Sequence, residues 1–432
     1  MLFGDVKIFY CGGFLLKRIQ PIVCLFFFSV LAASGIAQEV ETPIQTLTLQ
    51  QAVEQALANY PALQIQQYSI EQARGVKTTA GLFPKPVITF YREDLNLNGE
   101  GGGETTVFAG LPLNFLWSRW SKVAAASAQV DAEQMMLADV QRLLKFEVQK
   151  AFAETHFSVQ NYQAWQKAAN VFRRAAEASR FRFADGDMAG YENQRIAVEY
   201  LRYQKAEAEA LVQFNNNQRQ LAFFLNPDQS EALIKTSAVF PSHLPGISKE
   251  KLLAQSLETR PDLQAARATL RGKRAGLTAN KWGRLPQIIA SVGYKKQVDD
   301  FKGAVVQVNF GFPLFNRNQG NVRSASAALS QQTMVTELLE KRVALEIRQA
   351  YETYQLYRQL VRQFLAESVQ PTEQLLETAQ FSYSEGEMSL LELLDGVRAY
   401  SESFQARNDL LLKYQLSIFE LEKATATSIT DF

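Results

Sequence analysis

The residue types that most often carry catalysis or bind metals are scarce in this sequence. The 432 residues include two Cys and two His, too few for a typical zinc site or a disulfide framework. His156 falls within a predicted long helix, and His243 lies between two prolines. The chain also lacks a G-x-S-x-G, a P-loop and a G-x-G-x-x-G motif. We therefore predict that the protein is not an enzyme and has no metal site and no cofactor.

Carboxylates, in contrast, gather at two places that are 200 residues apart. The first group is Asp185, Gly186 and Asp187, and the second is Glu385, Gly386 and Glu387. Each group lies between two long predicted helices, where a glycine with a positive φ would end the first helix and reverse the chain. A plain turn between helices explains the glycines. The flanking carboxylates would in addition favour cations at that end of the molecule.

A second set of charged residues follows Gly386. Glu392 and Asp395 are three residues apart, so they share one face of a helix. Arg195 occupies the place in the first half of the chain that corresponds to Asp395. Charges on helices usually face solvent, so an exposed helix face without a special role is the alternative interpretation of these residues.

The spacing of about 200 residues recurs along the chain. Three pairs of matching positions illustrate it: Tyr60-Pro61 with Arg260-Pro261, Pro86 with Pro286, and Pro112 with Pro313. Ordered matches of this kind indicate a tandem duplication. We therefore divide the chain after its first 37 residues into two structural repeats, 38–246 and 247–432, rather than into the three domains that its length alone would suggest.

The first 37 residues have the features of a secretory signal peptide. Lys17 and Arg18 precede an apolar run over residues 21–33, and small residues follow as far as Ala37. A transmembrane anchor is the alternative, but the run is shorter than the roughly 20 residues that a spanning helix needs. Both Cys lie in this segment, so the predicted mature chain, 38–432, contains none.

The charge balance excludes a dedicated nucleic-acid-binding protein. Lys and Arg total 45 against 44 Asp and Glu, a net charge of +1, whereas phosphate recognition needs a basic excess. With 47% hydrophobic residues, the chain can bury a large core. No long uncharged apolar stretch follows residue 37, so we expect no membrane-spanning helix in the mature chain.

Four long helices are predicted, over about 114–183, 188–225, 316–383 and 388–425. Two of them carry apolar seams in which steps of four and three residues alternate, as is typical of coiled coils. The seams are Leu144, Val148, Ala151, Thr155, Ser158, Tyr162, Trp165, Ala169 and Phe172, and Val343, Ile347, Ala350, Tyr354, Tyr357, Val361 and Phe364. A helix over 316–383 would reach roughly 100 Å. Pro371 should bend or interrupt it.

Four strands are predicted between the helices, over about 87–95, 105–113, 287–297 and 303–312. Apolar and largely polar side chains alternate most clearly in the last two, so each of these strands has one apolar face. Strands of about ten residues suit a tilted transmembrane strand, although a half-buried hairpin packed on the helices would show the same alternation. Four strands cannot close a barrel, and lipid does not tolerate open strand edges. Transmembrane strands would therefore require an oligomer.

Four segments carry a resemblance to a known family. They are LTLQQAVEQALANYPAL from Leu47, its second copy around Arg260-Pro261-Asp262-Leu263, PLFNRNQGNV at 313–322, and FSYSEGEMSLLELLDGVRAY at 381–400. Together with the duplication, they make residues 47–425 resemble the bacterial outer-membrane efflux proteins of the TolC type. The third segment and SLLELLD are most similar to the subgroup that serves heavy-metal cation exporters of the RND class.

The resemblance implies an α+β membrane protein with an internal tandem duplication. Each protomer would give four transmembrane β-strands to a 12-stranded trimeric β-barrel in the outer membrane of a Gram-negative bacterium. A long antiparallel α-helical coiled-coil barrel would extend below it into the periplasm. This homotrimer would be the exit duct of a tripartite efflux pump for heavy-metal cations or drugs. Its partners would be a periplasmic membrane-fusion adaptor protein, an inner-membrane transporter of the RND type and outer-membrane lipid, with no nucleic acid.

The same resemblance assigns roles to the charged residues. Asp185, Gly186, Asp187, Glu385, Gly386 and Glu387 would be helix tips that dock on the adaptor. Glu392 and Asp395 would form a periplasmic gate or constriction, which pairing with Arg195 would hold shut. Two other functions stay open: a type I protein-secretion outer-membrane channel, and a soluble periplasmic coiled-coil adaptor or scaffold in which the strands pack on the helices.

Overall fold

The fold is taken from a computed structural model, which describes residues 45–97, 100–231, 233–237, 248–367 and 372–429. The predicted signal peptide over 1–37 lies outside these described residues, as do His243 and Pro371. Within the described ranges, none of the helices combines the length and the apolar character that a membrane-crossing helix requires.

Each half of the chain begins with two helices that meet at a proline. These are α1 (Leu49–Asn59) and α2 (Pro61–Gly81) in the first half, and α5 (Lys249–Thr259) and α6 (Pro261–Trp282) in the second. A proline is well suited to the first helical position, because the amide that it lacks would have no partner there. Pro61 and Pro261 therefore each begin the second helix of their half.

The long helices follow in each half. They are α3 (Phe115–Ala184), α4 (Gly190–Leu225), α7 (Gln319–Glu367), α8 (Thr372–Ser384) and α9 (Leu390–Thr425). With 70 residues, α3 reaches about 105 Å. Most of the helix predicted over 316–383 is present as α7 and α8. The four residues between them, which include Pro371, lie outside the described residues, so the predicted bend or interruption there stays a prediction.

Two sheets accompany the helices. The larger is antiparallel, with the order β2 (Val87–Leu97), β3 (Glu100–Pro112), β5 (Gln287–Lys296), β6 (Lys302–Gly311). In the smaller, β1 (Gln45–Leu47) pairs in parallel with β4 (Ile234–Thr236), which follows the short 3₁₀ helix η1 (Pro227–Gln229). The hairpins of the two halves thus lie side by side, joined by β3 and β5, while β2 and β6 are the edge strands.

The register of the larger sheet places apolar side chains of all four strands on one face. Ile88 pairs with Ala109, Ala109 with Val292, and Val292 with Val306. Ile88 is 76% exposed and Val306 is 73% exposed. A sheet face this open does not fit the alternative in which the hairpins pack on the helices. The other face is more polar and carries an ion pair of 2.5 Å between Lys295 and Glu104.

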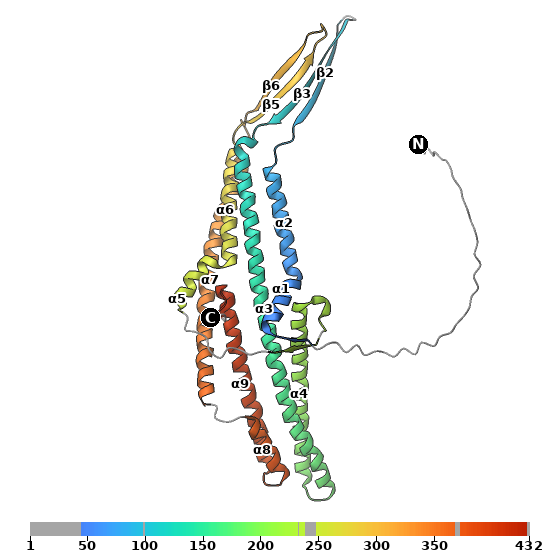
Figure 1. The fold of residues 1–432 in the computed structure, drawn as a ribbon, viewed down its shortest axis with the longest axis vertical. Helices are drawn as coiled ribbons and strands as arrows, with labels where there is room; N and C mark the ends of the chain where they lie inside the picture. Colours follow the sequence, from blue (N-terminus) through green and yellow to red (C-terminus); the bar gives the residue numbers. More distant parts are fainter. Residues whose placement is uncertain (1–44, 98–99, 232, 238–247, 368–371, 430–432) are drawn as a thin grey trace, which may run out of the picture. The chain divides into compact units, whose positions relative to one another are not determined.

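The core lies between the helices, in three clusters along their length. Both predicted seams face it: every described seam residue is buried or half-buried, and Val148, Phe172, Val343 and Ile347 are completely buried. Figure 1 shows the four-stranded sheet at one end of α2, α3, α6 and α7, and the α3–α4 and α8–α9 turns at the other end. The apolar sheet and the acidic turns are therefore widely separated.

Candidate functional site

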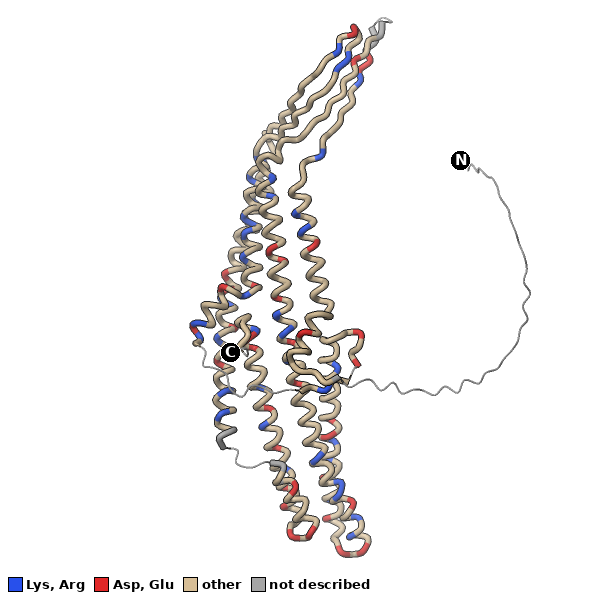
Figure 2. The backbone as a smooth tube through the Cα atoms, in the orientation of Figure 1, with Lys and Arg blue, Asp and Glu red and all other residues tan. Residues whose placement is uncertain are grey.

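The two acidic segments form closely similar turns. In each, the glycine amide donates to the carbonyl three residues earlier, at 3.2 Å, and the next amide donates to the carbonyl five residues earlier, at 2.8 or 2.9 Å. The φ angles of Gly186 and Gly386 are +81° and +78°, which confirms the positive φ predicted from the sequence. The carboxylates flank the glycines on exposed residues, and Figure 2 shows them in red at both turns.

Replacing Gly386 by valine is expected to destabilise this end of the protein by about 1–2 kcal/mol, because a side chain with a Cβ is strained at this φ. A Cβ there would meet no other atom within 4 Å, so backbone strain alone is tested. Thermal unfolding of purified protein would measure the change. The matched control is Gly320→Val, which has equally open surroundings without the positive φ and should stay within about 0.5 kcal/mol. Equal effects of the two substitutions would contradict the explanation.

A groove between α4 and α9 brings the predicted gate residues together. Arg195 lines it from α4, and Glu392 and Asp395 line it from α9. The groove has a volume of about 600 Å³. Its other charged residues are Glu199, Arg202, Arg398 and Glu402. The groove is therefore lined by four carboxylates and three guanidinium groups. In both α4 and α9, these residues follow the acidic turn within the first few helical turns.

Glu392 has a structural task in this groove. Its carboxylate accepts hydrogen bonds from the backbone amide and from the hydroxyl of Ser389, both at 2.8 Å, while the Ser389 hydroxyl accepts from the Glu392 amide. This is a capping box at the start of α9. The amide and then the hydroxyl of Ser389 hold the pKa of Glu392 below its usual value, so the carboxyl group is ionised at neutral pH. The Ser389-x-x-Glu392 pattern is visible in the sequence, although the prediction did not use it.

Asp395 is more available for a ligand or a partner. It is exposed, and no hydrogen bond or ion pair joins it to Arg195 or to any other residue that the structure describes. Its neighbour Arg398 is already engaged with Glu402 at 2.8 Å, and the pKa of Arg398 is raised by that pair first and by the charge of Asp395 second. The structure thus places Arg195, Glu392 and Asp395 around one groove, while pairing between Arg195 and the acids stays a prediction.

The sequence-based prediction missed several residues of this groove. Arg202 lies 3.8 Å from Glu199 on the α4 side of the groove. Tyr203 is buried at the base of the groove, and this burial is the main cause of the raised pKa of its hydroxyl group. The ring of Tyr203 stacks on Phe172 with 4.6 Å between the centroids. The sequence does contain a signal for them. Charged residues recur at spacings of three and four over 195–202 and over 395–402, which places them on one face of each helix together with the predicted gate residues.

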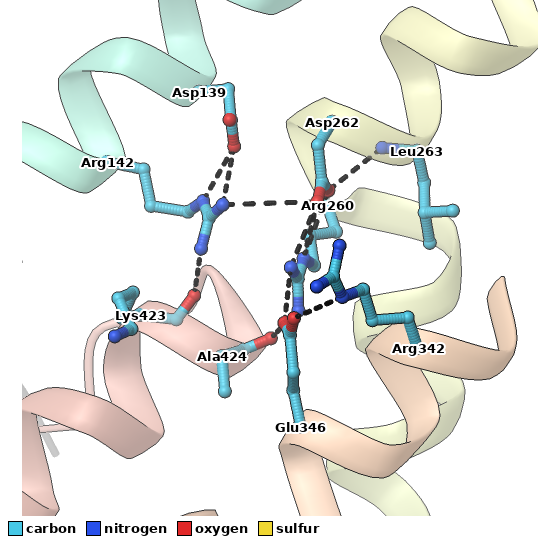
Figure 3. Close-up of polar contacts among 9 residues, drawn as sticks. All are labelled: Asp139, Arg142, Arg260, Asp262, Leu263, Arg342, Glu346, Lys423 and Ala424. Atoms are coloured by element: carbon cyan, nitrogen blue, oxygen red, sulfur yellow. Dashed lines mark hydrogen bonds and ion pairs between the residues drawn. The ribbon is translucent and has the colours of Figure 1, made fainter. Parts of the chain in front are cut away.

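The opposite end of α9 is fixed by a buried arginine (Figure 3). The Arg260 side chain is 5% exposed and donates to the carbonyl of Ala424, at 3.0 Å, and to the carboxylates of Asp262 and Glu346, at 2.9 and 2.7 Å. Burial acts against its charge, but the hydrogen bonds and charges of the two acids outweigh burial and raise its pKa. The last carbonyls of a helix have no partner within the helix, so Arg260 satisfies one of them.

Arg142 of α3 repeats this arrangement beside it. Its guanidinium donates to the carbonyl of Lys423 and, at 2.6 Å, to Asp139, and it lies 4.0 Å from Asp262. Arg142 and Asp139 are each 11% exposed. The ion network therefore connects α3, α6 and α7 to the C-terminal end of α9, whereas the other end of α9 lines the groove.

No cluster of three or more His, Cys, Asp or Glu side chains suited to a metal ion occurs among the residues that the structure describes. His156, half-buried on α3, has Thr236 at 3.3 Å and Gln160 at 2.9 Å as neighbours of its two ring nitrogens, and burial lowers its pKa. The groove between α4 and α9 presents charges of both signs that can attract ions or a partner.

Comparison with known sequences relates the chain to membrane export. Residues 252–427 match the family model for outer membrane efflux proteins. The cobalt-zinc-cadmium resistance protein CzcC of Cupriavidus metallidurans is 24% identical over 367 residues, which cover 84% of this chain and 85% of that protein.

Solved structures share the fold. The outer membrane channel CmeC of Campylobacter jejuni has a TM-score of 0.74 at 19% identity, with 88% of this chain and 86% of that chain covered. The outer membrane channel MtrE of Neisseria gonorrhoeae, solved in its open state, has a TM-score of 0.68 at 17% identity, with 88% and 89% covered. The chain therefore has the mostly helical fold, with a small number of strands, that these channels have.

Proposed function

We propose that the chain is an outer membrane efflux protein, the family whose model matches residues 252–427, and that it forms the outer-membrane exit channel of a tripartite efflux pump. The observation that carries this proposal is the four-stranded sheet with an exposed apolar face, which lies at one end of very long helices. Lipid would cover that face, and α3, about 105 Å long, would reach far into the periplasm.

The edges of the sheet support a homotrimer. β2 and β6 each have a pairing partner on one side only, and a bilayer does not tolerate unpaired strand edges. If β6 of one protomer pairs with β2 of the next, every edge is satisfied. Three copies would form a barrel of 12 strands, continued by the helices as a duct in the periplasm.

Fractionation of cells tests this proposal. The protein should sediment with the outer membrane, need detergent for extraction and run as a trimer. Recovery as a soluble monomer would contradict the channel and would favour the soluble coiled-coil adaptor or scaffold. A type I secretion channel would give the same result in this assay. Deletion of its gene, however, would stop the export of a protein, whereas deletion of an efflux channel would reduce resistance to small toxic compounds.

The two ends of the helical part suggest where partners and gating lie. The exposed turns around Gly186 and Gly386 would dock on a periplasmic adaptor, which in turn links to an inner-membrane transporter of the RND type. Asp395 and Glu392 would line the periplasmic gate with Arg195 as the basic partner. A structure of the related channel MtrE in an open state supports gating in this fold.

We further propose divalent metal cations as the cargo. CzcC is a cobalt-zinc-cadmium resistance protein, and the carboxylates at the turns and in the groove of this chain would attract cations to the entrance. A deletion strain should grow less well than wild type on cobalt, zinc and cadmium salts, while its growth on dyes and antibiotics should be unchanged. The reverse pattern would assign the channel to drug efflux.

A further inference from the structure

The helix ends next to the four-stranded sheet carry basic residues and no acidic ones. Residues 72–86, 113–130, 263–286 and 312–336, which adjoin the sheet on all four helices, contain neither Asp nor Glu. We use the name basic collar for the positive residues nearest the sheet: Lys85, Arg119, Lys281, Arg284, Arg317 and Arg323. In Figure 2 the helices show blue without red at this level. A surface with this composition has an unbalanced positive charge.

The side chains of the basic collar are available for a partner. Five are exposed and Arg119 is half-buried, and none of the six forms an ion pair with any residue that the structure describes. Arg119 donates to the carbonyl of Gly81 at 2.8 Å, which ties the end of α2 to α3 and leaves its charge uncompensated. These positive charges lie on α3, α6 and α7 and on the segments that connect α2, α6 and α7 to the strands. Charges spread in this way fit an anionic surface that surrounds the protein better than they fit a small ligand.

Exposed aromatic side chains lie at the same level. Phe83, Trp120, Trp282 and Phe315 are 67%, 73%, 40% and 93% exposed. The guanidinium of Arg119 lies 5.3 Å from the ring centroid of Phe83 and 5.9 Å from that of Trp120. Aromatic rings beside basic side chains are typical of the interface between membrane and water, where the rings enter the lipid and the charges reach the headgroups.

The strands above the basic collar have the matching pattern. No charged residue occurs in 86–91, 105–118, 285–294 or 303–316. A neutral band therefore crosses the sheet, about eight residues or roughly 27 Å long on β3, β5 and β6 and shorter on β2. Beyond the band, charges of both signs appear, such as Glu93, Asp94, Lys295 and Lys296. The two borders of the band therefore differ: one has mixed charges, and the other is purely basic.

We propose that the basic collar binds the headgroups of anionic phospholipids in the leaflet on the helix side of the membrane. The proposal rests on the proposed function, because only a bilayer around the sheet brings headgroups to this level. A zwitterionic headgroup has no net charge to match the basic collar. An anionic headgroup is attracted over a distance of about the Debye length, so the basic collar would enrich such lipids around the channel and fix its depth.

Tryptophan fluorescence tests the proposal on the intact protein. Of the four Trp, Trp117, Trp120 and Trp282 lie near the basic collar, and Trp165 is removed as Trp165→Phe in every sample. The protein is reconstituted into phosphatidylcholine vesicles that contain an equal mole fraction of either dibrominated phosphatidylglycerol or dibrominated phosphatidylcholine, since bromine quenches a nearby Trp. Quenching by the anionic lipid should exceed quenching by the neutral lipid by roughly twofold to fivefold, and high salt should reduce the ratio.

Two sets of substitutions locate the effect. In the variant with Lys281→Gln, Arg284→Gln and Arg317→Gln, which removes half of the basic collar, the ratio should fall by about half of its excess over one. Quenching by the neutral lipid should stay at its wild-type level, which would show that the variant inserts normally. The matched control combines Arg174→Gln, Arg219→Gln and Arg407→Gln, which remove three exposed arginines from the long helices, and it should keep the wild-type ratio.

The outcomes separate this proposal from the proposed function. Equal quenching by the two lipids in wild type would overturn the lipid preference while leaving a membrane channel in place. A preference that is undiminished after removal of the three basic residues would overturn its assignment to the basic collar. The absence of quenching by either lipid would mean that the sheet does not enter a bilayer, and it would overturn the proposed function as well.

Discussion

Replacement of Arg260 by methionine is expected to destabilise the protein by about 3 kcal/mol, because removing one partner of a buried ion pair leaves the other charge uncompensated. The expected loss is at the low end of the usual range of about 3–5 kcal/mol. The reason is that both acids would keep some compensation: Asp262 still has Arg142 at 4.0 Å, and Glu346 is 41% exposed to water. Thermal unfolding in detergent should show the loss as a midpoint several degrees lower. Hydrogen exchange should accelerate in the last turn of α9.

Arg342→Met is the matched control for this substitution. Arg342 also pairs with Glu346, at 3.8 Å, but its side chain is 74% exposed, so its removal should cost less than about 1 kcal/mol. If both variants unfold at the same temperature, the Arg260 network is not what holds the C-terminal end of α9. If Arg260→Met lowers the midpoint of thermal unfolding but leaves hydrogen exchange in α9 unchanged, Arg260 does not act by holding the end of α9.

Asp395→Ala is expected to weaken the block of the channel by divalent cations by about tenfold, which corresponds to about 1.4 kcal/mol. In the proposed trimer, one substitution per protomer removes three exposed carboxylates from the periplasmic entrance, where the summed field acts on a passing cation. The conductance of single channels in planar bilayers should also rise, since the proposed pairing with Arg195, which would hold the gate shut, could no longer form. Both quantities come from the same recordings.

Asp409→Ala is the appropriate comparison, because it removes the same side chain from the same helix. Asp409 pairs with Lys413 at 2.7 Å and lies about 21 Å along α9 from Asp395. Conductance and cation block should be unchanged in this variant. If Asp395→Ala likewise leaves both unchanged, the assignment of Asp395 to the gate should be dropped.

Much of the local structure could be predicted from the sequence. The two seams predicted buried helix faces because a period of three to four residues places apolar side chains on one stripe. The glycines between acidic residues predicted tight reversals because few other residues adopt a positive φ. Alternating side chains predicted which residues share a face of the sheet, and the register agrees across the four strands. Each of these features depends on neighbouring residues only.

The tertiary structure decided what distant residues do together. Arg260 corresponds to Tyr60 in the first half, where the ring packs on Phe223 and Phe224. Only the placement of the C-terminal end of α9 beside Arg260, between α5 and α6, makes Arg260 the centre of an ion network. The groove that joins Arg195 to Asp395 depends in the same way on α4 and α9 both packing against α3.

The sequence by itself therefore determined the element types, the reversals and the neutral band with its basic border. It could not determine which charges are compensated. That depends on side chains more than 100 residues apart, such as Arg142 and Lys423, being brought together by packing of the helices. The free energy of a charge is set by its burial and by its partners within a few ångströms, and only the folded chain defines those.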